Sequence, residues 1–285
     1  MRATGLPPRL LLSDIDGTLL DDGGELPALN RNALEASRRE GVFVALATGR
    51  RWSTTKRLLE RLDLAPLVDY AIMNNGMVVK DLRRDAVLQA HAFPLSTVIQ
   101  VIERWNSLGY EPIVLSHSRN GLEPDIFYRT LSLMNGDFIE KNPGQGRLID
   151  GVENIMGLDL VELLLLGPHP ELLHAEKSLF GLPVETALIK NSFYREWMLE
   201  ITPLGISKLS GALFLQEKLG VGKQGTMAIG DSANDLPLLE AAGHAVAMAH
   251  APEGLKARAH AVAGDNPSGS MGQAVMAWLE NGLRV

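Results

Sequence analysis

The sequence contains no cysteine, and this absence excludes disulfide bonds, thiolate metal sites and cysteine nucleophiles. Long apolar runs are also missing. The longest, Leu160 to Leu166, is interrupted by Glu162 and is far shorter than the ~20 residues that span a bilayer. We therefore expect no transmembrane helix and no membrane partner.

Blocks of basic residues are missing as well. The chain has 27 Lys and Arg residues against 34 Asp and Glu residues, which gives a formal net charge of −7. Because neutralising nucleic-acid phosphates requires clustered Lys and Arg, we expect no nucleic-acid partner. Pro7 and Pro8 interrupt the first residues before an apolar segment develops, so no secretory signal is expected. Together with the absence of cysteine, this favours a cytoplasmic protein.

The composition that is present is ordinary for a globular protein. Hydrophobic residues make up 46% and charged residues 21%, which excludes a disordered, collagenous or coiled-coil chain. At roughly 150 residues per domain, the 285 residues predict two domains.

Strand-like and helical stretches alternate in the first and last thirds of the chain, as in parallel β-α-β units. In the first third we expect strands at 9–14, 42–48 and 70–73, with helices at 27–40 and 53–62. In the last third we expect helices at 207–219 and 236–242, with strands at 226–230, 245–248 and 259–263. Neither third alone has enough strands for a covered sheet, so the two predict one doubly wound core.

The middle of the chain has a different pattern, with several Gly and Pro breaks. The expected elements there are helices at 97–108 and 170–180 and strands at 111–115 and 159–166. The predicted fold class is α/β: a parallel, Rossmann-like core of residues 1–82 and 196–285, with an α+β domain of residues 83–195 inserted into it.

Polar residues follow the predicted core strands at the points where ligands bind in open parallel sheets. These residues, with a lysine at the start of a helix, are Asp14, Asp16, Thr18, Thr48, Gly49, Arg50, Lys208, Asp231, Asn234 and Asp235. Carboxylates at adjacent strand ends repel one another by several kcal/mol at a modest effective dielectric, so a cation is implied. Oxygen ligands without Cys or a His pair favour Mg²⁺. Thr48, Lys208 and the turn amides would then bind a phosphate beside the metal.

Each of these segments also has a purely structural interpretation. The Asp14–Gly17 stretch could be an ordinary turn, and Thr48-Gly49 a strand exit followed by a turn glycine. Lys208 could be an exposed helix lysine, and Asp235 could cap the helix that begins at Leu236. The joint order of the clusters favours the functional interpretation.

The core segments resemble those of the haloacid dehalogenase superfamily and, within it, the Cof-type phosphatases with a large cap domain. The resemblance rests on DIDGT (14–18), LATGR (46–50), the lysine of GISK (205–208), GDSANDLPLLEAAG (230–243) and VAMAHAPE (246–253), and it covers residues 9–82 and 196–282.

The resemblance implies a role for each core residue. Asp14 would be the nucleophile, and Asp16 the acid that protonates the leaving oxygen and later activates water. Mg²⁺ would bind Asp14, the backbone carbonyl of Asp16 and Asp231, with Asp235 and Asn234 completing the shell or binding substrate. Thr48, Gly49 and Lys208 would hold the phosphoryl group. An acid at position 16 favours phosphatase or phosphomutase chemistry.

Three residues at two places depart from the family pattern, and the middle domain offers a few candidates for substrate contact. Ala249 and His250 replace the usual glycine and asparagine, and Ser270 replaces a common valine. His250 is either a substrate contact or an exposed loop histidine. Arg50 and, in the inserted domain, Arg119, Tyr128 and Arg129 are candidates for substrate recognition, with solvated surface residues as the alternative for the last three.

The sequence therefore predicts an Mg²⁺-dependent phosphatase acting on small phosphorylated metabolites through an aspartyl-phosphate. The alternatives are a phosphomutase of the same branch, which returns the phosphate to its substrate, and a non-catalytic sugar-phosphate sensor.

Overall fold

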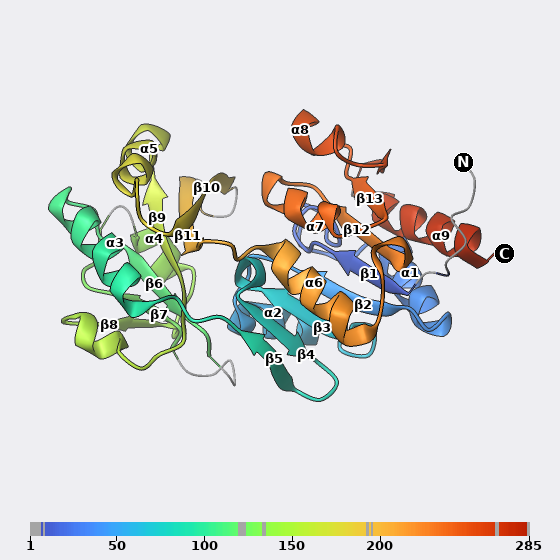
Figure 1. The fold of residues 1–285 in the computed structure, drawn as a ribbon, viewed down its shortest axis with the longest axis horizontal. Coiled ribbons are helices and arrows are strands. Elements are labelled where there is room, and N and C mark those ends of the chain that lie inside the picture. The colour runs from blue at the N-terminus through green and yellow to red at the C-terminus, as the bar shows by residue number, and fades with distance from the viewer. Residues whose placement is uncertain are drawn as a thin grey trace. The chain divides into compact units, whose positions relative to one another are not determined.

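The computed structural model describes residues 7, 9–118, 124–132, 135–191, 194, 196–265 and 268–283 (Figure 1). The chain divides into two compact units. The first unit comprises Met1–Arg50, Thr55–Gln89 and Ser207–Val285, and the second comprises Arg51–Thr54 and Ala90–Ile206.

The first unit is built on a largely parallel sheet. In spatial order its strands are β14 (Ala261–Val262), β13 (His244–Ala247), β12 (Thr226–Gly230), β1 (Leu10–Ser13), β2 (Phe43–Ala47), β3 (Tyr70–Met73), β4 (Val78–Asp81) and β5 (Ala86–Ala90). The pairs from β14 to β3 are parallel, and β4 pairs antiparallel with β3. Strand β1 lies between β12 and β2, so the first and last thirds of the chain share one sheet.

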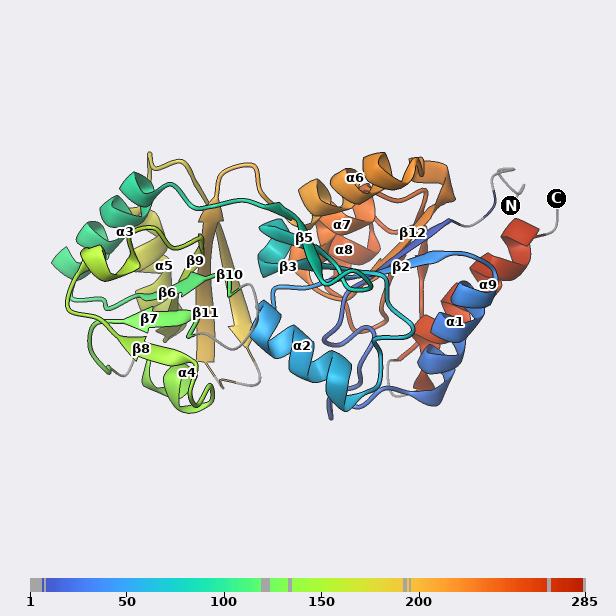
Figure 2. The same ribbon diagram turned by 90° about the horizontal axis from the view of Figure 1, so that it is seen from below.

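Helices cover both faces of this sheet. They are α1 (Ala28–Arg39), most of α2 (Trp52–Arg61), α6 (Lys208–Leu219), α7 (Leu236–Glu240), α8 (Glu253–Lys256) and α9 (Ser270–Leu283), with short 3₁₀ turns η1 (Asn74–Gly76), η3 (Lys223–Gly225) and η4 (Ala233–Asp235). Leu10 and Leu12 pack with Leu215 of α6 and Leu238 of α7 on one face. Figure 2 shows α1 and α9 on the other face. The predicted doubly wound core is confirmed, whereas α9 had no counterpart among the expected elements.

The second unit contains a mainly antiparallel sheet. Its strands, in spatial order, are β10 (Val184–Asn191), β11 (Glu196–Pro203), β9 (Leu160–Gly167), β6 (Ile113–Ser116), β7 (Ile126–Tyr128) and β8 (Gly146–Leu148). Its remaining elements are α3 (Leu95–Ser107), α4 (Gly136–Glu140), η2 (Val152–Ile155) and α5 (His169–Ser178). Trp105 of α3 packs against Leu163 and Leu165 of β9, and its Nε1 donates a hydrogen bond to the carbonyl oxygen of Ala175 (3.1 Å).

The sequence pattern placed the inserted domain at residues 83–195, and the compact units divide the chain elsewhere. β5 extends the edge of the first sheet beyond β4, and β11 pairs with β9 in the second sheet. Both strands lie outside the elements that periodicity predicted. Among the described residues, no helix combines the length and apolar character that crossing a membrane requires.

Candidate active site

The first strand of the core places Asp14 inside the protein and Asp16 at its surface. The Asp14 amide donates to the carbonyl oxygen of Ile229 (3.0 Å), so the sheet ladder fixes the backbone just beyond β1. The chain then turns at Gly17, whose φ is +80°. A Cβ at Gly17 would lie 2.5 Å from Oδ2 of Asp231, so the glycine allows the two segments to approach.

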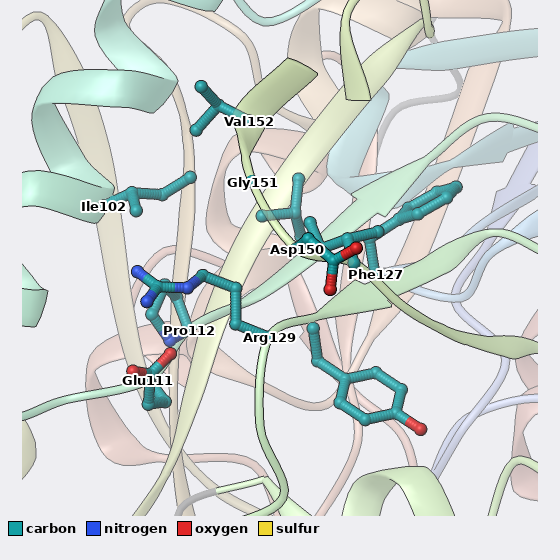
Figure 3. Close-up of a pocket in the computed structure, with 11 residues that line it drawn as sticks. Ile102, Glu111, Pro112, Phe127, Arg129, Asp150, Gly151 and Val152 are labelled. Carbon is teal, nitrogen blue, oxygen red and sulfur yellow. The ribbon is translucent and has the colours of Figure 1, made fainter. Parts of the chain in front are cut away.

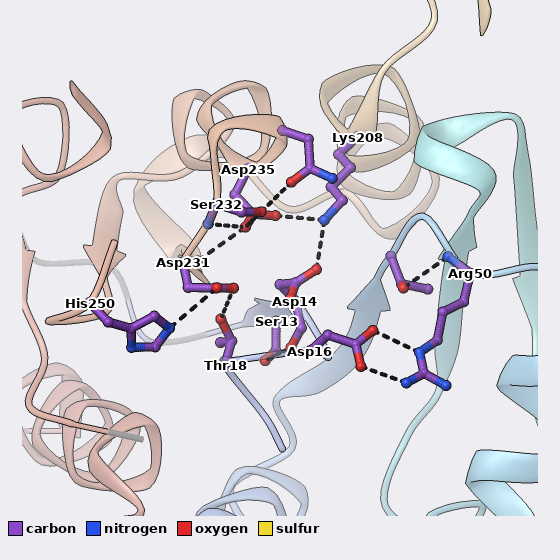
Figure 4. Close-up of polar contacts among 12 residues, drawn as sticks. Ser13, Asp14, Asp16, Thr18, Arg50, Lys208, Asp231, Ser232, Asp235 and His250 are labelled. Carbon is purple, nitrogen blue, oxygen red and sulfur yellow. Dashed lines mark hydrogen bonds and ion pairs between the residues drawn. The ribbon is translucent and has the colours of Figure 1, made fainter. Parts of the chain in front are cut away.

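A buried lysine joins the first acid to the last acidic cluster. Lys208 Nζ lies 2.6 Å from Oδ1 of Asp14 and 2.6 Å from Oδ1 of Asp235 (Figure 4). The other oxygen of Asp235 accepts hydrogen bonds from the amides of Asp231 and Ser232 (both 3.0 Å). Lysine at the start of α6 and carboxylates at the ends of β1 and β12 thus meet as the sequence pattern predicted.

This geometry decides two of the alternatives left open by the sequence. Lys208 is only 1% exposed and is therefore not an ordinary surface lysine. Asp235 precedes α7, but its side chain makes no cap hydrogen bond to that helix. It binds the preceding turn and Lys208 instead.

The charges in this cluster strongly perturb one another. Burial raises the pKa of Asp14 well above its usual range and Asp235 raises it further, while Lys208 opposes the shift. Burial also raises the pKa of Asp231, again with a contribution from Asp235. For Lys208, burial alone would lower the pKa, but Asp14 and Asp235 together raise it, so this lysine stays charged.

The cluster fits a divalent cation. Oxygen atoms of Asp14, Asp231 and Asp235 lie within 4.8 Å of one another. Thr18 Oγ1 donates to Oδ1 of Asp231 (3.0 Å) and orients that carboxylate. The three carboxylates outnumber the single ammonium of Lys208, and the donors are all hard oxygens, which suit Mg²⁺. The Asp16 side chain is not part of this group, in keeping with a predicted ligand role for its backbone carbonyl only.

The expected phosphate-binding residues lie on the turns around this cluster. Thr48 is buried at the end of β2, where its amide donates to the carbonyl oxygen of Ile72 (2.8 Å). Its hydroxyl oxygen accepts the amide of Arg50 (3.0 Å), which leaves the hydroxyl proton able to serve another acceptor. Asn234, in η4, accepts a hydrogen bond from the hydroxyl of Ser232 through its side-chain oxygen.

Asp16 and Arg50 form an ion pair that the sequence did not predict. Arg50 Nε lies 2.7 Å from Oδ2 of Asp16, and an Arg50 terminal nitrogen lies 2.5 Å from Oδ1. Figure 4 shows Asp14 pointing toward Lys208 and Asp16 pointing toward Arg50. The two acids of the DIDGT segment therefore have different partners.

The η1 turn holds two of these segments together and was not identified as functional from the sequence. The amides of its first two residues donate to the carbonyl oxygens of Arg50 and Thr48 (both 3.1 Å). A Cβ on Gly76, which has φ +104°, would lie 2.0 Å from the carbonyl oxygen of Ser207. The Asn-Asn-Gly run at the carboxyl end of a predicted core strand was the available signal.

The two departures from the family pattern have different surroundings. His250 Nε2 lies 3.3 Å from Oδ2 of Asp231, and its side chain is 42% exposed. Ser270 Oγ donates to the carbonyl oxygens of Gly264 (2.8 Å) and Asp265 (2.9 Å), so it closes the loop before α9. His250 thus contacts the acidic cluster, while Ser270 has a structural contact.

The candidates in the second unit stay predictions. Arg129 and Tyr128 line a cavity of about 70 Å³ in this unit, and Glu111, Phe127 and Asp150 line it as well (Figure 3). Arg119 lies outside the described residues.

The chain was compared with protein-family models and with known proteins. A family model described as haloacid dehalogenase-like hydrolase matches residues 11–275. The pyridoxal phosphate phosphatase YbhA of Escherichia coli K12 is 29% identical over 284 residues, which cover 95% of this chain and 98% of the relative. The 5-amino-6-(5-phospho-D-ribitylamino)uracil phosphatase YcsE of Bacillus subtilis is 26% identical over 272 residues, which cover 95% of this chain and 96% of that relative.

A solved structure supports the fold assignment. A haloacid dehalogenase-like hydrolase from Bacteroides thetaiotaomicron superposes with a TM-score of 0.78 at 22% identity, covering 95% of this chain and 99% of that one. At this identity the likeness concerns the fold alone.

Proposed function

Because the chain belongs to the haloacid dehalogenase-like hydrolases, we propose that it is an Mg²⁺-dependent phosphatase that hydrolyses small phosphate monoesters through an aspartyl-phosphate. The observation that carries the proposal is the bridge from Lys208 Nζ to Asp14 and Asp235, at 2.6 Å each, inside a group of three carboxylates. Such a cluster combines a nucleophile, an excess of negative charge and a fixed cation at one point.

Asp14 is the proposed nucleophile because it lies at the centre of this cluster. Its Oδ1 is held by Lys208, which orients the carboxylate and offsets its repulsion from a phosphate dianion. Asp14, Asp231, Asp235 and the backbone carbonyl of Asp16 would hold Mg²⁺, which when bound supplies positive charge to the transferring phosphoryl group.

The turns around Asp14 provide donors for that phosphoryl group. The Thr48 hydroxyl keeps its own proton after accepting the Arg50 amide, and Lys208 adds a charged donor. Gly49 would let the phosphate approach the backbone, and Asn234 completes the proposed set. These donors are fixed before substrate arrives, so they need little reorganisation during the reaction.

Asp16 is the proposed acid and base. Its side chain is 57% exposed, so it can meet both a leaving group and water, whereas Asp14 is buried. In the first step Asp16 gives a proton to the leaving oxygen, and in the second it takes a proton from the water that attacks the aspartyl-phosphate.

The proposed substrates are phosphorylated metabolites. The named substrates of the two relatives, pyridoxal phosphate and a phosphoribitylamino-uracil, are both phosphate monoesters of primary alcohols. We propose that this chain also acts on such esters, with the inserted domain, in which Arg119 and Arg129 are candidates, selecting the leaving group. The expected cytoplasmic location stays a prediction.

The test is phosphate release from a panel of pyridoxal phosphate, a hexose 6-phosphate, glycerol 3-phosphate and 4-nitrophenyl phosphate, with and without Mg²⁺. We expect Mg²⁺-dependent release of inorganic phosphate and a ³²P-labelled phosphoenzyme on acid quench. Isomerised substrate without phosphate release would identify a phosphomutase. Binding of the metabolites without turnover of 4-nitrophenyl phosphate would identify a sensor, and either result would overturn the proposal.

A further inference from the structure

The ion pair between Arg50 and Asp16 uses both oxygens of the carboxylate. Nε of Arg50 contacts Oδ2 at 2.7 Å, and a terminal nitrogen contacts Oδ1 at 2.5 Å. This two-bond arrangement fixes the plane and direction of a carboxylate, which a single contact does not. The observed pair therefore fixes the direction in which the Asp16 carboxylate points.

The backbone of Arg50 is itself anchored. Its amide donates to the hydroxyl oxygen of Thr48 (3.0 Å), and its carbonyl oxygen accepts the amide of Asn74 (3.1 Å). The guanidinium thus reaches Asp16 from a fixed point in the loop after β2. Asp16 lies in the turn after β1, where an isolated bridge joins it to Leu20.

Stability does not account for this arrangement. The side chains of Asp16 and Arg50 are 57% and 33% exposed. Ion pairs this accessible to water contribute little to folding, because solvent screens them and their side chains lose entropy. At such an exposed position, a bidentate contact fixes the orientation of the Asp16 carboxylate.

We propose that Arg50 is a positioning residue that holds the Asp16 carboxylate for the hydrolytic half of the reaction. In that step a water oxygen attacks phosphorus and the bond from phosphorus to the Asp14 oxygen breaks, with its electron pair returning to Asp14. The proton of the water passes to Asp16, and inorganic phosphate leaves. This inference rests on the proposed phosphatase function and gives Arg50 a different role from the substrate contact expected from the sequence.

The experiment compares wild type, Arg50→Gln and Arg50→Lys in pre-steady-state turnover of 4-nitrophenyl phosphate, whose leaving group needs little acid assistance. If Arg50 acts on the second step, Arg50→Gln retains rapid phosphorylation but accumulates phosphoenzyme. We expect kcat to fall about 10- to 100-fold, a fraction of a full acid–base contribution. The burst of 4-nitrophenolate should be larger than in wild type, and KM should fall with kcat. Arg50→Lys can make a single contact with the carboxylate, so its kcat should lie between those of wild type and Arg50→Gln.

A double-mutant cycle separates this role from phosphate binding. Asp16→Asn removes the group that Arg50 positions. Adding Arg50→Gln to Asp16→Asn should therefore lower kcat by less than about a further threefold. The matched control is Arg61→Gln, which breaks another exposed Arg–carboxylate pair of the same unit, that of Arg61 with Glu25 (2.9 Å), and should leave the kinetics unchanged.

Three outcomes would overturn the inference. Arg50 would be a phosphate ligand if the two substitutions lowered kcat by multiplying factors in the double variant. In that case Arg50→Gln would also raise KM and would show no larger burst than wild type. Wild-type kinetics in both Arg50 variants would remove any role. A thermal melting temperature that falls well below that of Arg61→Gln in both variants would make the pair structural. If wild type itself releases no phosphate, the proposed function fails first, and the two failures are thereby distinguished.

Discussion

The two acids of the DIDGT segment occupy opposite halves of the site, and their charges are balanced in different ways. Asp14 is buried with Lys208 and Asp235, where burial and like charge raise its pKa. Asp16 is largely exposed and pairs with Arg50. Water cannot relax the charges of the inner half, so its geometry must be supplied by fixed partners. The outer half is open to solvent.

The difference teaches that one short turn can place a nucleophile and an acid–base group in unlike surroundings. Gly17, at φ +80°, is where the chain turns back toward the interior after the exposed Asp16. If this division is right, changes to the inner half should be severe and should depend on the metal, while changes to the outer half should be milder.

The largest effect is expected for Asp14→Asn. The variant keeps the shape of the side chain and removes the charged nucleophile, so kcat should fall by at least ~10³. The measurement is phosphate release with Mg²⁺ present, with Asp22→Asn, an exposed acid of the same loop, as control. A variant that keeps a tenth of the wild-type rate would contradict the assignment.

Metal removal should come next. Chelation should abolish turnover, and Mg²⁺ should restore it, because the cation offsets the mutual repulsion of the Asp14, Asp231 and Asp235 carboxylates and the phosphoryl group. Saturating Mg²⁺ should also stabilise the fold, by about 2.7 kcal/mol at a hundred times its Kd. Ca²⁺ should bind but inhibit, because its larger and looser coordination shell would misalign the Asp14 nucleophile. Full activity in excess chelator, or equal rates with Ca²⁺, would exclude the model.

Lys208→Met should lower the rate on every substrate by a similar factor of roughly 10²–10³, as expected for loss of one preorganised donor. It also leaves Asp14 and Asp235 without their buried partner, which should cost about 3–5 kcal/mol of unfolding free energy in the metal-free protein. Urea unfolding with and without Mg²⁺ measures this, and Lys218→Met, an exposed position on α6, is the control. A reordered substrate ranking would argue against a phosphoryl contact.

A smaller effect is expected on the pH dependence of stability. The raised pKa values of Asp14 and Asp231 mean that the folded, metal-free protein retains protons that the unfolded chain releases near pH 3.8. Their contribution to stability is therefore lost as pH rises above that value. The raised pKa of Lys208 contributes stability that persists to its ordinary value of 10.5 and is lost only above it.

The measurement is the free energy of unfolding from pH 4 to 8 in chelator, for wild type and Asp231→Asn. Wild type should lose stability relative to the variant as pH rises, and saturating Mg²⁺ should flatten the difference. A difference that grows in favour of wild type at higher pH would show that these carboxylates are stabilised by ionising.

The smallest effect is expected for His250→Ala. His250 lies 3.3 Å from Asp231 but is 42% exposed, and exposed pairs contribute about 0–1 kcal/mol. We expect kcat/KM and the Mg²⁺ concentration for half-activation to change by less than about fivefold. A tenfold weaker response to Mg²⁺ would move His250 into the inner half of the site.

Much of the core and its acidic cluster could be predicted from the sequence, because parallel strands bring their carboxyl ends to one edge of the sheet. Asp14 and Asp231 follow adjacent strands, β1 and β12, and Lys208 begins a helix that packs on them. Their meeting needs only the correct strand order. The matching family model confirmed the family assignment, and the observed sheet confirmed the doubly wound core.

The rest depended on details that periodicity does not encode. The pair of Arg50 with Asp16 follows from side-chain directions in two turns, and the role of η1 follows from the close approach of Gly76 to Ser207. β5 and β11 are defined by the partners with which they pair, which is a property of the folded sheet rather than of either segment. Local sequence carries little information about such contacts.

The position of β1 beside β12 also has a consequence for the order in which the protein acquires its activity during synthesis. Leu10 pairs with Thr226, so the core sheet cannot close until the ribosome has released more than two hundred further residues. The second unit, mostly the continuous segment Ala90–Ile206, can fold while the first strand still waits for its partner. Contacts this distant in sequence form slowly. A nascent chain therefore carries Asp14 without Lys208 or Asp231 while the residues between them are translated, and the proposed phosphoryl chemistry can begin only after those residues have been added.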